Sequence, residues 1–147
     1  MARTITENFL PVRIHVKEQP DDWKRCTERY HALWTPTILL LDPEGVEQHR
    51  IEGFLPVEDF LAQIELGLGH AAFKRQDWRG AERWFDNVAQ HHGESDAAAE
   101  ATYWVGVARY KASGDAHHLS DTAETFAHRF QDTPWAKKAS VWTKRAA

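Results

Sequence analysis

Cys26 is the only cysteine in this 147-residue sequence, and it is the first side chain to weigh for nucleophilic or redox chemistry. Disulfide exchange needs an attacking thiolate and a second thiol that resolves the intermediate, so one cysteine cannot complete the cycle within the chain. Cys26 shares an apolar helical face with Trp23 and Tyr30, and free cysteines are often buried. We therefore expect an inert core residue, with a reactive or regulatory thiol as the alternative.

Nine histidines raise the question of a metal site. They include two adjacent pairs, His91-His92 and His117-His118, followed by His128. A structural zinc site needs four ligands at defined spacing, whereas neighbouring residues on a helix point to different sides. The nearest helical pairing joins His117 or His118 to Asp121. We expect solvated histidines near helix ends and no metal or other cofactor, with zinc binding as the alternative.

Adjacent carboxylates could act as general acids or bases, but they have a simpler explanation here. Asp21-Asp22 and Glu58-Asp59 lie at the starts of predicted helices, where negative charge is favoured. The sequence also lacks the local pattern of a nucleophile elbow. These residues therefore do not predict an enzyme.

The composition, with 42% hydrophobic and 27% charged residues, is that of a globular protein of one domain or two small ones. The net charge is −4 and basic residues are dispersed, which argues against a nucleic-acid partner. No run of 18 apolar residues is present, and the start MARTITENFL lacks the apolar core of a signal peptide. We expect no membrane span, and a cytoplasmic location is the default expectation.

The elements that position these residues show two kinds of pattern. Up to residue 69 the patterns predict strands at 12–16, 37–41 and 46–52, a helix after Pro20, and a helix from Pro56. An Asp-Pro-Glu-Gly turn joins the last two strands into a hairpin. From about residue 70 only helical periodicity remains. Breaks at 93–95, 113–115 and 133–134 divide it into four or five helices.

Residues 5 to about 68 resemble the second half of a thioredoxin-like domain. The similarity lies in ITENFLPVRIHV, a short helix, and WTPTILLLDPEGVEQHRIEGFLPVEDFLAQIELGLG. In that family the proline matching Pro36 is cis, and the residue matching Thr35 presents its backbone to an extended substrate peptide. The resemblance therefore implies a partner-binding surface at Trp34, Thr35 and Pro36. Trp78, which precedes Gly80 in a turn, is a second exposed tryptophan that we expect to mark a partner surface.

The family's Cys-x-x-Cys pair and first strands would lie before Met1. This departure leaves two expectations: a non-catalytic protein-interaction module, or the C-terminal portion of a thiol–disulfide oxidoreductase whose active site lies upstream. In the family, the missing strand lies between those matching residues 12–16 and 37–41. Either these two strands pair directly, or an open edge is covered by the C-terminal helices or by a second copy. We therefore expect a protein or peptide partner and a homo-oligomer formed through an uncovered sheet edge.

Residues 69–142 resemble tetratricopeptide repeats, which usually bind other proteins or pack against their own chain. Gly69 precedes Phe85 by 16 residues, and Gly106 precedes Phe126 by 20, so the predicted repeat is imperfect. The predicted fold is α/β followed by all-α. A partial thioredoxin-like domain with about three strands occupies residues 1–69, and four to five tetratricopeptide-like helices occupy residues 70–147.

Overall fold

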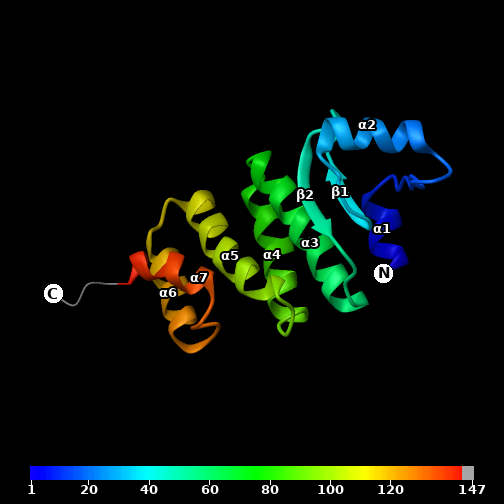
Figure 1. Cartoon of the computed structure of the whole chain (residues 1–147). Helices are drawn as coiled ribbons and strands as arrows, with labels where there is room; N and C mark the ends of the chain where they lie inside the picture. Colours follow the sequence, from blue (N-terminus) through cyan, green and yellow to red (C-terminus); the bar gives the residue numbers. More distant parts are fainter. Residues whose placement is uncertain (144–147) are drawn as a thin grey trace. The chain divides into compact units, whose positions relative to one another are not determined.

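A computed structural model describes residues 1–143 of the chain (Figure 1). The chain forms two compact units, Met1–Val57 and the part from Glu58 onward. The domain boundary expected after residue 69 lies inside a helix. Within residues 1–143, no helix has the length and apolar character needed to cross a membrane.

The N-terminal unit contains two helices and a β-hairpin. In chain order these are α1 (Ala2–Asn8), α2 (Pro20–Tyr30), β1 (Thr37–Leu41) and β2 (Glu47–Glu52). Helix α2 begins where the sequence predicts, because Pro20 suits the first turn and Asp21 and Asp22 place negative charge there. It ends at His31, whose left-handed conformation (φ 54°) turns the chain out of the helix.

The predicted hairpin is confirmed. Strands β1 and β2 pair antiparallel, from Thr37 opposite Glu52 to Leu41 opposite Glu47. Asp42 organises the turn, because its Oδ1 accepts hydrogen bonds from the backbone N–H of Val46 at 2.8 Å and of Glu44 at 3.1 Å.

The strand predicted at residues 12–16 is wrong, and so is its direct pairing with β1. The sheet within residues 1–143 has two strands rather than three. Leu10 is 96% exposed and Val12 is 84% exposed. The segment instead enters a turn in which the Gln19 N–H donates to the His15 carbonyl at 2.8 Å. Alternation of apolar and polar residues fits a strand, but an extended segment forms one only beside a neighbour that pairs its backbone groups.

The second unit is helical, as predicted. Its elements are α3 (Val57–Lys74), α4 (Trp78–His91), α5 (Ala97–Ser113), α6 (His117–His128), α7 (Pro134–Ala139) and a 3₁₀ turn, η1 (Ser140–Trp142). The expected breaks are confirmed. Thr133 caps α7 by accepting the Ala136 N–H at 3.2 Å, and Gly114 ends α5 in a left-handed conformation.

The core of the helical unit lies between α3, α4 and α5. Leu66, Phe85 and Val88 are its largest fully buried side chains. Buried alanines, among them Ala81 and Ala101, let the helices approach closely around them. A smaller cluster joins α5, α6 and α7.

At two glycines, the spacing between the glycine and the side chain that contacts it is more regular than the sequence predicts. The Phe85 ring lies against Gly69, as expected. The side chain against Gly106 is Thr122, however, and not Phe126. Both glycines therefore meet a residue 16 positions later, so the same helix-pair contact recurs. The relation to tetratricopeptide repeats stays a prediction.

Candidate binding rim at the start of strand β1

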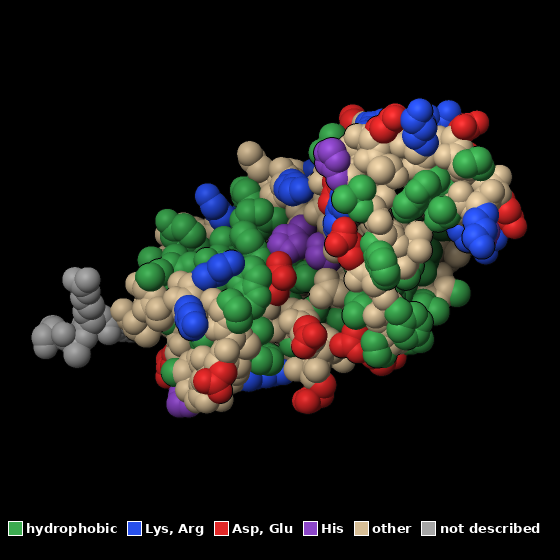
Figure 2. Space-filling view, viewed as in Figure 1, with side chains coloured by type: hydrophobic (Ala, Val, Ile, Leu, Met, Phe, Trp, Pro, Cys, Tyr) green, Lys and Arg blue, Asp and Glu red, His purple; other side chains and the backbone are tan. Residues whose placement is uncertain are grey.

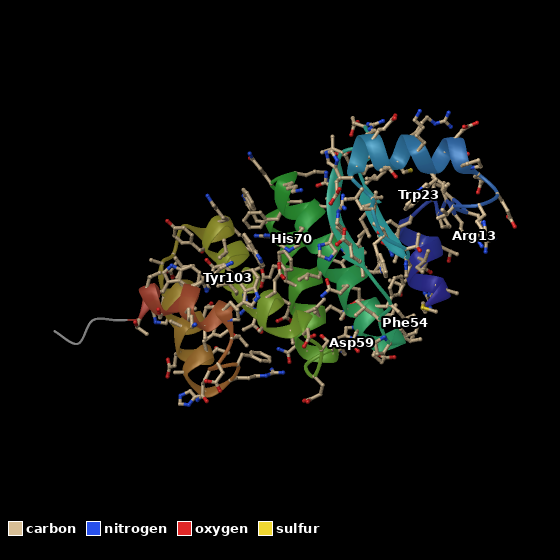
Figure 3. All side chains as sticks on the ribbon, in the orientation of Figure 1. Arg13, Trp23, Phe54, Asp59, His70 and Tyr103 are labelled. Atoms are coloured by element: carbon tan, nitrogen blue, oxygen red, sulfur yellow. The ribbon has the colours of Figure 1, made fainter. Side chains whose placement is uncertain are left out.

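Three large apolar side chains are exposed on the two loops that flank the hairpin. Leu33 is 75% exposed and Trp34 is 69% exposed on the loop before β1, and Phe54 is 85% exposed on the loop after β2. Figure 3 labels Phe54, and Figure 2 shows hydrophobic side chains at the surface of the N-terminal unit. We define residues Leu33–Pro36 together with Phe54 as the rim.

Hydrogen bonds hold the two loops of the rim side by side. The Gly53 N–H donates to the Pro36 carbonyl at 2.8 Å, which extends the ladder beyond the strands. The Thr37 hydroxyl donates to the Trp34 carbonyl at 2.6 Å and closes a turn over Thr35 and Pro36. The Thr35–Pro36 peptide bond is cis, as the resemblance implies. The exposed side chains therefore sit on loops of defined path.

The other end of the rim loop is fixed to helix α2 and to the hairpin turn. Ala32 is buried, with 3% exposure, and its carbonyl accepts a hydrogen bond from the Thr27 hydroxyl at 3.1 Å. The Tyr30 hydroxyl donates to the Gly45 carbonyl at 2.9 Å. Gly45 has a φ of +78°, and a Cβ there would lie 2.7 Å from an Arg29 nitrogen. Helix and turn thus meet at a backbone conformation that favours glycine.

Arg50 of β2 joins the hairpin to the end of α2. Its Nε and Nη2 each donate to a carboxylate oxygen of Glu47 at 2.8 Å, and its Nη1 donates to Glu52 at 3.0 Å. The same guanidinium donates to the carbonyl of Tyr30 and, at 3.4 Å, to that of His31. Hydrogen bonds to Glu47 and then to Glu52 raise the pKa of Arg50 above its already high range, against the opposing effect of burial.

The rim offers apolar surface and backbone groups, since none of its five residues carries an acid, a base or a nucleophile that titrates. It brings together three of the four predicted partner-binding residues: Trp34, Thr35 and Pro36. The fourth, Trp78, lies on α4 of the helical unit. Trp78 is half-buried against Phe73, with ring centroids 4.9 Å apart.

A family model for a thioredoxin-like domain matches residues 1–67. The first part of the chain is thus similar to thioredoxin-like domains. This range agrees with the resemblance seen at residues 5 to about 68. No curated protein and no solved structure matches the chain significantly.

Cys26 is half-buried in the thioredoxin-like part, and its expected place in a core is wrong. It lines an open groove of about 550 Å³ together with Ile14 of the preceding loop and charged residues of α2. The physical reason is that helix α2 buries none of its residues completely, so its apolar face is only partly covered. The inertness of the thiol stays a prediction.

The histidines divide into solvated and buried ones. His117 is exposed as predicted, and it pairs with Asp121 at 3.0 Å. The prediction is wrong for His92, whose side chain is 11% exposed and lies 3.3 Å from the Glu65 carboxylate. The reason is that the end of α4 packs against α3, and α3 covers the imidazole of His92. Within residues 1–143, no group of three or more histidine, cysteine or acidic side chains is arranged to hold a metal.

The sequence patterns did not single out His70, which is mostly buried on α3 (Figure 3). Its Nε2 lies 2.9 Å from a Glu100 carboxylate oxygen, and its ring meets Phe85 and Trp104 edge-on. Its spacing of four residues from the buried Leu66 is the signal that could have found it.

Proposed function

We propose that the chain is a non-catalytic protein-interaction module whose rim binds an extended apolar segment of a partner protein. The observation that carries this proposal is the exposure of Leu33, Trp34 and Phe54 on hydrogen-bonded loops of one unit. Single exposed apolar residues are ordinary, whereas large ones on two adjoining loops indicate an interaction site. Tryptophan in particular contributes strongly to binding when a partner covers it.

The hydrogen bonds that fix the backbone of the rim support binding as much as its apolar side chains do. Association is weakened when loops must be ordered, and a loop that is already fixed avoids that loss. Ala32 is anchored at one end of the rim loop, and Pro36 is bonded to Gly53 at the other. The exposed side chains between these anchors are thus displayed with little backbone freedom to lose.

The test uses reduced, carboxymethylated α-lactalbumin, an unfolded probe without free thiols, whose binding is measured by fluorescence anisotropy. We expect Trp34→Ala and Leu33→Ala each to weaken binding about tenfold, since a buried anchor contributes more than 1 kcal/mol. Leu10→Ala is the matched control, because Leu10 is 96% exposed in the same unit but lies outside the rim. Equal affinity of wild type and Trp34→Ala would contradict the proposal.

The non-catalytic part of the proposal rests on the single thiol of the sequence. A disulfide-reduction assay with insulin separates it from the thiol–disulfide oxidoreductase alternative. We expect the chain to show the same rate as a Cys26→Ser variant, because no resolving thiol is available within it. Turnover above that of the variant would overturn the assignment.

We also propose that strand β1 associates with a second copy of the chain. Within residues 1–143, no backbone hydrogen bond joins the outer edge of β1 to another segment. The strand reads TILLL and has no charge or proline to discourage pairing, whereas β2 reads EQHRIE. Because the strand is uncharged, two copies of β1 can pair antiparallel without facing like charges.

A further inference from the structure

Arg50 makes polar contacts within strand β2 and, at the same time, with the end of helix α2. A guanidinium has five N–H groups, and Arg50 makes five contacts: three to the carboxylates of Glu47 and Glu52, and two to the carbonyls of Tyr30 and His31. The carboxylates are on β2 itself, and the carbonyls are at the end of α2. One side chain therefore connects the hairpin to the point where the rim loop begins.

We propose that Arg50 is the positioning residue of the rim. This inference rests on the proposed function of the rim. Carbonyl groups at the end of a helix have no partner within the helix, and a cation there is favoured by the helix dipole. By binding the carbonyls of Tyr30 and His31, Arg50 fixes the residue at which the chain leaves α2. That direction sets where Leu33 and Trp34 are displayed.

The neighbouring anchors do not duplicate this role. The Tyr30 hydroxyl binds the carbonyl of Gly45, so it ties the helix to the hairpin turn. The Thr27 hydroxyl binds the carbonyl of Ala32, one residue further along the loop. Within residues 1–143, Arg50 is the side chain whose hydrogen bonds reach the carbonyls of both Tyr30 and His31.

The two carboxylates determine what the loss of Arg50 does. Glu47 and Glu52 hold the guanidinium in place while it donates to the carbonyls. An uncharged residue at position 50 leaves both carboxylates and both carbonyls without this cation, and all four groups are electron-rich. Lysine keeps the charge but lacks the planar set of donors, so it replaces only part of the arrangement.

The test compares Arg50→Met, Arg50→Lys and the matched control Arg25→Met in two measurements. Arg25 forms an exposed ion pair with Asp22 on α2 and makes no hydrogen bond to the rim. One measurement is the ¹H–¹⁵N heteronuclear NOE of the Leu33 and Trp34 amides, which reports their mobility. The other is the affinity for carboxymethylated α-lactalbumin.

For Arg50→Met we expect lower NOE values at Leu33 and Trp34 and a loss of affinity of about tenfold, because a loop that has become mobile must be ordered when the probe binds. Arg50→Lys should lie between wild type and Arg50→Met, and Arg25→Met should match wild type. In a Leu33→Ala/Trp34→Ala background Arg50→Met should weaken binding no further, because Arg50 acts through the display of these two side chains. Further loss in that background would show a general structural effect and overturn the inference.

If Arg50→Met unfolds the unit, Arg50→Lys carries the test through its intermediate NOE values. Unchanged NOE values and affinity in a folded Arg50 variant would also overturn the inference. Failure of the proposed function looks different: wild type and Trp34→Ala would then bind the probe equally, while the NOE values still report whether Arg50 positions the loop.

Discussion

Single residues in this chain owe their properties to what covers them more than to their type. Cys26 and His92 illustrate both directions. The apolar spacing around Cys26 predicts burial, yet the apolar face of helix α2 is only partly covered and leaves the thiol on a groove. The position of His92 near a helix end predicts solvation, yet its imidazole is covered beside Glu65. Neither outcome follows from local sequence, because both depend on which element packs against the helix.

Tyr103 provides a prediction about pH at this scale. Its ring stacks on Trp142, with centroids 4.8 Å apart, and also contacts Trp135. Burial disfavours the phenolate and raises the pKa of Tyr103 above 10. The folded state therefore keeps this proton at a pH where the unfolded chain has released it. The resulting stability is present below pH 10 and is lost as the pH rises through the raised pKa.

We therefore expect the free energy of unfolding to fall less steeply between pH 9.5 and 11.5 in Tyr103→Phe than in wild type. Urea titrations monitored by circular dichroism at several pH values make the comparison. Tyr110→Phe is the matched control, since it makes the same chemical change on the same helix, α5. Parallel curves for wild type and Tyr103→Phe would contradict the assignment.

At the scale of elements, the sequence predicted correctly those structures whose determining residues lie within the element or its own turn. The hairpin follows from the Asp-Pro-Glu-Gly turn, and α7 follows from Thr133 followed by Pro134. The strand expected at residues 12–16 failed because a strand needs a partner that its own sequence does not supply. The rim loop was found through the family resemblance, while its anchoring by Arg50 involves residues 20 positions apart.

The helix pairs were predicted as elements, but their contact at Gly106 was assigned to the wrong residue. Thr122 lies against Gly106, and an added Cβ would be 1.9 Å from its hydroxyl oxygen. We expect Gly106→Ala to lower the free energy of unfolding by about 1–3 kcal/mol, the usual range for overpacking. Thr122→Ala should restore part of this loss in the double variant, because it removes the clashing oxygen.

The control for the double variant is Thr125→Ala. Thr125 is exposed on the same helix, and its hydroxyl makes the same kind of bond, to the carbonyl four residues earlier, as Thr122 does. Chemical denaturation of the single and double variants gives the coupling energy. A rescue by Thr125→Ala as large as that by Thr122→Ala would contradict the assigned contact.

At the scale of the molecule, the two-stranded sheet that the structure describes within residues 1–143 is the feature that most needs support from another strand or helix. A two-stranded hairpin is marginally stable alone, and additional strands or a packed helix usually support it. The family resemblance of residues 5 to about 68 predicted a thioredoxin-like part with about three strands, whereas the sheet within residues 1–143 has two, so neither of its outer edges pairs with a further strand there. The two edges differ in sequence, because β2 carries Glu47, Arg50 and Glu52, whereas β1 is uncharged.

The proposed pairing of two β1 strands makes a prediction about assembly. The Gly53–Pro36 hydrogen bond sets the alternation of the ladder, which points the N–H and carbonyl of Leu39 toward the open edge. Leu39→Pro removes an N–H from that edge and leaves the bonds between β1 and β2 in place.

We expect wild type to form dimers with rising concentration in sedimentation velocity, and Leu39→Pro to remain monomeric with an unchanged circular dichroism spectrum. Leu10→Pro, the same substitution outside the sheet, should dimerise like wild type. A sedimentation coefficient of wild type that does not change with concentration would contradict β1 pairing, and the rim would then be the only interaction surface left in the proposal.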